Sequence, residues 1–331
     1  MSGAAASHGP LPAARTMRAA VLAGPRRFEL AEVPRPAPGP GEVLVRLEGS
    51  GVCGSNLAPW QGRPWFHYPF PPGAPGHEGW GRVAAVGPGV AELTEGDRVA
   101  LLSGAAFAEY EVAPAERAVP IPGAISGPFP GEALGCGVNV FRRSRIRRGD
   151  QVALVGAGFL GLVALRLAAQ AGARVTALSR RQTSLRRARA YGAEATVATG
   201  DREAAVDAVR EMTSGRLCDV VIEAVGNQDA LDLASRLVRE GGRLVVAGYH
   251  QDGPRLVDMG LWNWRGIDVV NAHERDPRVQ REGVARAAAE VAEGRLDPGL
   301  LYESFPLERA GEAFRAMEER PDGFVKALLI T

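Results

Sequence analysis

The spacing of apolar residues changes partway along the chain. From Met17 to about Pro122, short alternating or β-branched runs such as EVLVRLEG and GRVAAVG are separated by glycine and proline. This pattern is typical of short strands joined by irregular loops. From about Phe141 the apolar runs become longer, and DQVALVGAGFLGLVALRLAAQAG predicts a buried strand, a glycine turn and a helix.

The second part of the chain continues with strands and helices in turn. ARVTALS, CDVVIEAVG and GGRLVVAGYH predict three more strands, and SLRRARAYGA predicts a helix that Gly192 ends. Such alternation indicates an α/β fold with a doubly wound parallel sheet. After about Asn271, VQREGVARAAAEVAEG and FPLERAGEAFRAMEER predict two helices, and VKALLI predicts a closing strand. Because 331 residues are too many for one ordinary core, we expect two domains.

Composition and charge narrow the class of protein. The chain is 46% hydrophobic and 23% charged, which is typical of a soluble globular protein. A formal charge of +1 without a dense basic block argues against a nucleic-acid partner. No run of about 18 apolar residues is present, which argues against a membrane span. Residues 1–16 lack the apolar stretch of a secretory signal and predict a disordered tail, with Met17 as a natural start.

The cysteines indicate the compartment. The chain has three, at positions 53, 136 and 218, with no short-spaced pair among them. This odd number argues against a disulfide framework and favours a reducing cytoplasm.

The segment GAGFLG fits the dinucleotide fingerprint G-x-G-x-x-G, and it lies between a predicted strand and a predicted helix. Gly156 permits the tight turn, Gly158 lets the backbone approach a pyrophosphate, and Gly161 lets the helix pack on the strand. Phe159 and Leu160 complete the motif, at the helix end whose free N–H groups attract phosphate. We therefore predict a dinucleotide site here.

The end of the next predicted strand bears on which dinucleotide binds. NAD enzymes usually place an acid there, whereas this chain has Ser179, Arg180 and Arg181. A hydroxyl and two guanidinium groups suit a 2′-phosphate, so NADP(H) is favoured over NAD(H). The alternative is that these arginines belong to a solvated face.

A set of metal-ligand side chains is dispersed along the β-rich part. Cys53 lies in GVCGSN, His77 and Glu78 lie together in GHEGWG, and Glu132 begins EALGCG. Thiolate, imidazole and carboxylate are the groups that bind a catalytic zinc. Each residue taken alone has a structural explanation, as a packing thiol, a hydrogen-bonded ring or a solvated charge. Only their combination indicates a metal site.

The motifs GVCGS, GHEGWG, EALGCGVNVFRR and GAGFLG, in this order, resemble the zinc-containing medium-chain dehydrogenase/reductase family, and its polyol dehydrogenase branch most of all. The resemblance runs from about Met17 to the C-terminus. It implies a GroES-like catalytic domain over 17–140 and 272–331, a Rossmann domain over 141–271, and a cleft between them.

The resemblance also implies roles for individual residues. Cys53 and His77 match zinc ligands, Glu78 matches an acid that can also coordinate, and Glu132 matches the remaining ligand position, with Cys136 a weaker candidate. Ser55 matches the hydroxyl that passes on the alcohol proton. Lys326 matches a basic residue near the cofactor phosphates.

Three departures from the family pattern stand out. The four close cysteines that hold a structural zinc after GDRV are missing, so we expect one catalytic zinc and no structural zinc. Asn56 replaces an aspartate that orients the histidine ligand, and still offers an amide acceptor. Ala58 replaces a relay histidine, which leaves water, the cofactor ribose or His67 to carry the proton.

The sequence thus predicts a zinc-dependent oxidoreductase that moves a hydride between NADP(H) and a secondary alcohol or ketone, with a sugar, polyol or cyclitol favoured. A zinc-independent enone or carbonyl reductase, a non-catalytic NADPH sensor and an epimerase with tightly held cofactor stay open. Family resemblance also suggests a homodimer or homotetramer. Side chains that could line the cleft, with core packing equally open for the aromatic ones, are Trp60, Trp65, Phe107, Tyr110, Asn139, Trp262, Trp264 and His273.

Overall fold

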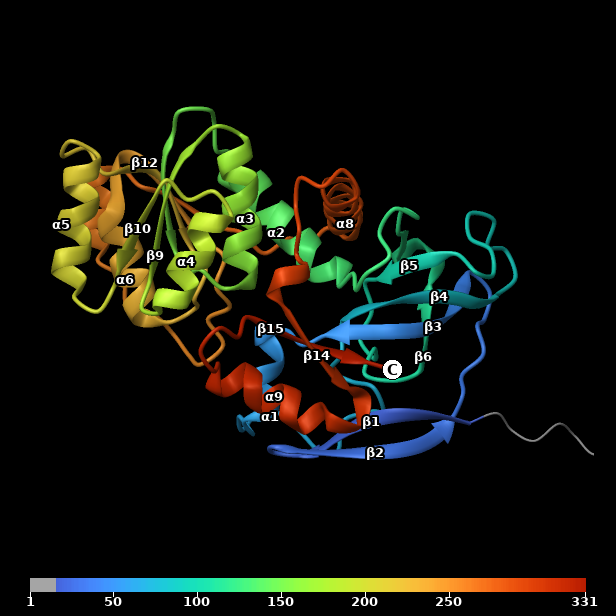
Figure 1. The fold of residues 1–331 in the computed structure, drawn as a ribbon. Coiled ribbons are helices and arrows are strands. Elements are labelled where there is room, and N and C mark those ends of the chain that lie inside the picture. Colours follow the sequence, from blue (N-terminus) through green and yellow to red (C-terminus); the bar gives the residue numbers. More distant parts are fainter. Residues whose placement is uncertain (1–15) are drawn as a thin grey trace, which may run out of the picture.

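Two large sheets, a two-stranded hairpin and the helices packed on them make up the protein (Figure 1), which we describe from a computed structural model covering residues 16–331. Residues 1–15 of the predicted tail lie outside the described residues. Thr16, the last residue of that predicted tail, instead begins strand β1 and pairs with Pro34 of β2, so the prediction was wrong at this position. A β-branched residue extends the ladder of its hairpin favourably.

The catalytic part is a mostly antiparallel sheet completed by the C-terminus. Its path runs β14-β15-β3-β4-β5-β7, with β6 paired to β3. The last strand, β15, pairs antiparallel with β3, so the C-terminal segment completes a sheet that is otherwise built mainly from residues 42–120. The strands of this sheet and the separate β1–β2 hairpin are β1 Thr16–Gly24, β2 Arg27–Pro34, β3 Glu42–Gly51, β4 Glu78–Val86, β5 Arg98–Leu101, β6 Tyr110–Pro114, β7 Ala118–Pro120, β14 Tyr302–Pro306 and β15 Lys326–Ile330.

The second sheet is parallel and has the order β10-β9-β8-β11-β12-β13. Its central strand β8 is buried from Val152 to Val155, as a strand covered on both faces must be. The strands are β8 Gln151–Val155, β9 Arg174–Ser179, β10 Ala195–Ala198, β11 Cys218–Glu223, β12 Val238–Val246 and β13 Asp268–Asn271. The helices of this part are α3 Phe159–Gln170, α4 Gln182–Ala190, α5 Arg202–Met212, α6 Gln228–Leu237 and α7 Met259–Arg265. This is the predicted Rossmann arrangement.

Helices α2 Gly131–Ser144 and α8 Pro277–Ala292 pack together between the two sheets (Figure 1). One apolar core runs through them, from Trp80 in β4 through Leu134 and Val284 to Val163 in α3. The two domains therefore share a continuous core along this side, which fixes how the two halves of the site face one another.

A separate aromatic core lies under the β1–β2 hairpin. Trp60, Phe107 and Phe314 are fully buried there, and Phe28 stacks on Trp60 with ring centroids 5.8 Å apart. Phe314 comes from α9 Ala310–Glu319, and Trp60 ends the short helix α1 Leu57–Trp60. Trp60 and Phe107 therefore belong to the core and do not line a cleft. None of the helices within residues 16–331 has both the length and the apolar character to cross a bilayer.

Candidate active site

The candidate metal ligands meet where β3 and β4 end side by side. The antiparallel register pairs Gly51 with Glu78, which places Cys53, just beyond β3, beside His77, just before β4. One ligand atom from each of Cys53, His77 and Glu78 lies within 4.8 Å of the others. Gly51 makes room for this group, since a Cβ there would stand 1.8 Å from Oε2 of Glu78.

A backbone carbonyl orients the His77 ring. Nδ1 of His77 lies 3.0 Å from the Pro75 carbonyl oxygen, which can only accept, so Nδ1 carries a proton and Nε2 is the nitrogen that could bind a metal. Asn56 accepts from the Cys53 N–H at 2.9 Å and donates to the Pro75 carbonyl at 3.0 Å, and its amide nitrogen lies 3.5 Å from Nδ1 of His77. Asn56 thus supports His77 through the Pro75 carbonyl, which both side chains contact.

The electrostatics of His77 follow from the acidic groups around it. Burial by itself would lower the pKa of His77, but the hydrogen bond and charge of Cys53 and the charges of Glu132 and Glu78 raise it to about 10. Without a metal the ring is therefore a cation that neutralises its neighbours. A divalent cation would take over that function and displace the proton.

Glu78 is buried and paired with Lys326. The Lys326 ammonium Nζ lies 2.6 Å from Oε2 of Glu78 and donates to the Val52 carbonyl at 3.2 Å. The same Nζ lies 4.8 Å from the ring centroid of Phe159, in the glycine turn. Lys326 thus connects the metal-ligand group with the dinucleotide turn, while its predicted contact with cofactor phosphate stays a prediction.

Glu132 faces the metal-ligand group from the first turn of α2. Burial raises the pKa of Glu132, the charge of His77 opposes that rise and the charge of Glu78 adds to it. The Cys136 thiol donates to Oε1 of Glu132 across 3.1 Å. Burial and then the Glu132 charge hold the pKa of Cys136 well above its usual range, so it remains a thiol. Glu132 as a ligand stays a prediction, and Cys136 acts as its hydrogen-bond donor.

The donor set of this group fits zinc. Sulfur from Cys53, nitrogen from His77 and oxygen from Glu78 are the ligand types of catalytic zinc sites, which keep one further position open. Ser55 lies in the 3-10 turn Gly54–Asn56 that follows Cys53 and is half-buried. A substrate hydroxyl at such a metal would lie close to this turn.

The glycine turn fits a dinucleotide. Gly156 has φ +106°, and a Cβ at Gly161 would stand 2.2 Å from the Gly156 carbonyl oxygen, so both positions require glycine. Gly158 is the N-cap of α3, and Phe159 and Leu160 form its first turn. This arrangement presents free N–H groups to a pyrophosphate.

Ser179 ends β9 beside this turn, at the carboxyl edge of the sheet. The Arg181 N–H donates to the Ser179 hydroxyl at 3.3 Å, and Arg180 is exposed. Nη1 of Arg181 donates to the carbonyl of Arg320 at 3.3 Å. Sequence reasoning did not single out Arg320, which lies far away along the chain.

The loop after β12 adds contacts that the sequence did not reveal. Nε2 of Gln251 donates to the Gly54 carbonyl at 3.2 Å and so joins the Rossmann domain to the Ser55 turn. Glu223, fully buried at the end of β11, accepts from the Gly226 N–H at 2.7 Å and lies 3.0 Å from Nε2 of His250. No local motif marks these pairings, because each depends on how distant loops fold together.

The other proposed cleft residues are dispersed. Asn139 packs against Gly283 of α8, where a Cβ would stand 2.6 Å from its amide nitrogen. Tyr110 lies under Arg35, with the guanidinium 4.9 Å from the ring centroid. Trp65 and Trp264 are 54% and 85% exposed. Trp262 packs partly buried against the core under α6, and His273 is exposed beside Arg275.

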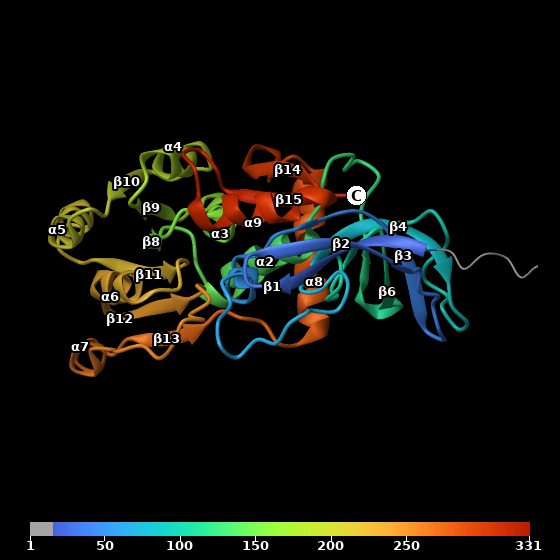
Figure 2. The same ribbon diagram turned by 90° about the horizontal axis from the view of Figure 1, so that it is seen from below.

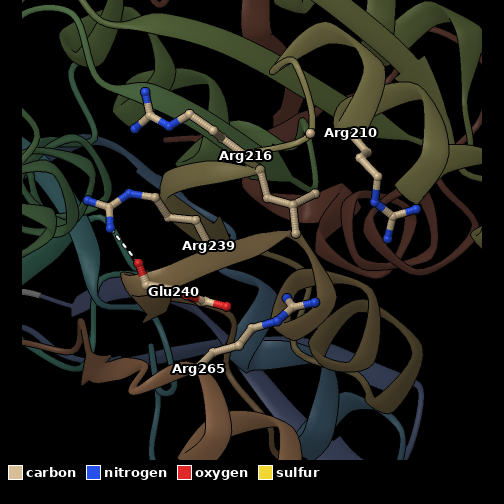
Figure 3. Close-up of a pocket in the computed structure, with 7 residues that line it drawn as sticks. Arg210, Arg216, Arg239, Glu240 and Arg265 are labelled. Atoms are coloured by element: carbon tan, nitrogen blue, oxygen red, sulfur yellow. Dashed lines mark hydrogen bonds between the residues drawn. The ribbon is translucent and has the colours of Figure 1, made fainter.

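A further basic cavity of about 410 Å³ lies at the opposite edge of the Rossmann sheet (Figure 3). Arg210, Arg216, Arg239 and Arg265 surround it together with Glu240. Protein groups already engage these arginines; for example, Arg239 pairs with Asp219 at 2.6 Å, and Arg265 donates to the Val238 carbonyl at 2.8 Å. This cavity is separate from the dinucleotide turn, which lies at the carboxyl edge.

Comparison with known proteins agrees with this geometry. Residues 39–123 match the family model of the alcohol dehydrogenase GroES-like domain, and residues 160–288 match that of zinc-binding dehydrogenases. An alcohol dehydrogenase from Moraxella sp. is 32% identical, covering 92% of this chain and 96% of that protein. The sorbitol dehydrogenase of Rattus norvegicus is 28% identical, and the alignment covers 90% of this chain and 92% of that protein.

A solved structure shows the same fold. The Sinorhizobium meliloti 1021 protein, described as a zinc-binding dehydrogenase bound to NADP, superposes with a TM-score of 0.82 at 27% identity. The alignment covers 96% of this chain and all of that one. Given these matches and the grouping of Cys53, His77 and Glu78, the chain belongs to the zinc-type medium-chain dehydrogenase/reductase family of alcohol and polyol oxidoreductases.

Proposed function

We propose that this chain is a zinc-dependent dehydrogenase that transfers a hydride between NADP(H) and a secondary alcohol or ketone of the sugar, polyol or cyclitol class. The observation that carries the proposal is the grouping of Cys53, His77 and Glu78 within 4.8 Å, with Lys326 linking Glu78 to Phe159 of the dinucleotide turn. The similarity to a sorbitol dehydrogenase supports the substrate class.

The residues of the site have distinct parts in this reaction. Zinc, when bound, supplies Lewis-acid polarisation of the substrate oxygen. Cys53 and His77 hold the metal, and the Pro75 carbonyl keeps the Nε2 edge of His77 turned toward it. Lys326 neutralises Glu78. Ser55 accepts the hydroxyl proton during oxidation and returns it during reduction. With Ala58 in place of a relay histidine, solvent at the half-buried Ser55 turn receives the proton.

The preference for NADP(H) rests on Ser179, Arg180 and Arg181 at the end of β9, where no carboxylate stands to bind a ribose 2′-hydroxyl. A relative of the same fold carries NADP. The double variant Ser179→Asp with Arg180→Ala should weaken NADPH binding by about 10- to 100-fold and leave or improve NADH binding. Arg186→Ala, on the exposed face of α4, is the matched control.

The quaternary proposal is a homodimer formed through β13. This strand is one of the two edge strands of the six-stranded sheet, β10 being the other, and Figure 2 shows it next to α7 along the lower side of the domain. Exposed apolar side chains accompany it, namely Leu256, Met259, Trp264 and Val269. An uncovered edge with apolar neighbours favours pairing with a second copy.

Cys53, Cys136 and Cys218 are free thiols, which supports a cytoplasmic location.

The reaction is tested with a panel of polyols, sugars, cyclitols and simple secondary alcohols, following NADP⁺ and NAD⁺ reduction by zinc-loaded protein. Turnover with a polyhydroxy substrate is expected, and Ser55→Ala should lower kcat by about 100-fold or more while zinc content is unchanged. Cys218→Ala, remote from the site, serves as a folding control. NADPH binding with no turnover would support a sensor, and full turnover without metal would support a zinc-independent reductase.

A further inference from the structure

The turn after α9 belongs to the catalytic domain but lies on the dinucleotide turn of the Rossmann domain. Arg320 ends α9 in the left-handed conformation, with φ +48°, and its N–H donates to the Ala316 carbonyl. The Phe324 N–H closes the next turn onto the Pro321 carbonyl at 2.9 Å. In Figure 2 this red segment reaches the end of α3 and α4. Its local hydrogen bonds fix where the Arg320 side chain begins.

The Arg320 guanidinium stands over Gly158. A Cβ built on Gly158 would lie 3.8 Å from Nη1 of Arg320, and beyond the adjoining backbone no other atom comes within 4 Å. The space above this glycine is therefore open except for one cationic group. The Arg320 carbonyl also accepts the hydrogen bond from Arg181, so the turn contacts both phosphate-facing segments of the Rossmann domain.

The positive charge at this point is only partly balanced within the protein. Burial and then the charge of Arg187 lower the pKa of Arg181, and the charge of Asp322 opposes them. Within residues 16–331 no carboxylate lies within 4.0 Å of the Arg320 or Arg181 guanidinium, and no acceptor binds the Arg320 side chain. Arg320 as a whole residue is exposed, but the protein packed around its guanidinium lowers its pKa, and the charge of Arg181 lowers it further. The N-terminus of α3 adds a partial positive charge at the same place. Lys326, by contrast, is already paired with Glu78.

We propose that Arg320 binds the pyrophosphate of the dinucleotide and thereby ties the catalytic domain to a cofactor seated on the Rossmann domain. The inference rests on the proposed function, because it requires a dinucleotide at the glycine turn. Arg320 thus adds a second phosphate contact to the one predicted for Lys326. This role of Arg320 is distinct from the role proposed for Ser179 and Arg180, which is to bind a 2′-phosphate.

The test compares dissociation constants of NADPH and NADH, measured by fluorescence titration, for the parent and for Arg320→Asn. Asparagine tolerates the left-handed conformation of Arg320, so the turn is retained and thermal stability without cofactor should not change. Arg320→Asn should weaken both cofactors equally, by about tenfold, as expected for one charge-assisted hydrogen bond. Arg320→Lys should recover part of this loss, and the control Arg315→Gln, exposed on the same helix, should bind as the parent does.

Each other outcome overturns the inference in a distinguishable way. Unchanged affinity in Arg320→Asn, with a parent that binds NADPH, removes Arg320 from the cofactor site and leaves the proposed function intact. Loss confined to NADPH moves Arg320 to the 2′-phosphate and contradicts the pyrophosphate contact. A parent that binds neither NADPH nor NADH refutes the proposed function itself.

Discussion

A backbone carbonyl holds the ring of His77 in place, and a lysine from the last strand of the chain pairs with the carboxylate of Glu78. The Pro75 carbonyl holds Nδ1 of His77, and Asn56 holds both this carbonyl and the Cys53 N–H. Removing Asn56 would therefore loosen two ligands at once. The family motifs indicated the candidate ligands from the sequence, but these supports depend on the β3–β4 register and on the return of the C-terminus.

The pKa of His77 leads to a prediction for metal binding. Since this pKa is about 10, the ring carries a proton at neutral pH in the metal-free protein and must lose it when zinc binds. Zinc affinity should therefore rise by up to about tenfold per pH unit between pH 6 and 9. Calorimetric titrations in buffers of different ionisation enthalpy measure the released proton. Binding heats that do not change with the buffer would show that His77 is neutral beforehand.

At the level of elements, α9 is held against α1 by one carboxylate. Glu318 accepts from Nε1 of Trp60 and Nε2 of Gln61, both at 3.0 Å, and pairs with Arg26 at 2.6 Å. These bonds, that of Arg26 most of all, lower the pKa of Glu318 to about 2. Because α9 also carries Phe314 and Arg320, this contact positions both the aromatic core and the turn over Gly158.

Glu318→Gln should lower the free energy of unfolding by about 1–2 kcal/mol at pH 7, a figure reduced for partial exposure of the group. A depressed carboxyl pKa contributes stability above its unfolded value, near 4.5, and loses it as the pH falls toward 2. The difference between parent and variant should therefore shrink below about pH 4.5. Urea denaturation at pH 7 and pH 3.5 measures this difference in the free energy of unfolding. A difference that grows on acidification would contradict this assignment.

Elements with long apolar runs or glycine signals were predictable, and short edge elements were not. The turn at Gly156–Gly161 carries its own local signature, and β8 reads as a buried strand without further context. Strands β10, β13 and β14 have four or five residues each and weak patterns of their own. They become strands because a neighbouring strand offers a ladder of partners, which is a tertiary effect.

The whole molecule is held together through the site as well as through the α2–α8 core. Gln251 reaches from the Rossmann domain to the Gly54 carbonyl, and Arg181 reaches the Arg320 carbonyl in the catalytic domain. Both contacts flank the place where cofactor and substrate would meet. The sequence indicated two domains and the residues on each side, but it could not show which distant loops touch.

The proposed homodimer through β13 concerns the whole molecule and can be tested by its mass in solution. Light scattering coupled to chromatography should give the mass of two chains for the parent, and Trp264→Asp should shift the mass toward one chain. Trp264 is 85% exposed, so the change should not disturb the fold of the single chain. The control Trp65→Asp, at another exposed indole, should remain dimeric. A parent that elutes with the mass of one chain would refute the proposal.

The proposed function depends above all on a catalytic zinc site formed by Cys53, His77 and Glu78. The most direct test is metal content by elemental analysis of purified protein never exposed to chelator, with Cys53→Ala alongside and Cys218→Ala as the control. About one zinc per chain is expected in the parent and in Cys218→Ala, and little in Cys53→Ala. A folded parent without zinc, or a Cys53→Ala variant that retains zinc fully, would rule out a zinc site at these residues.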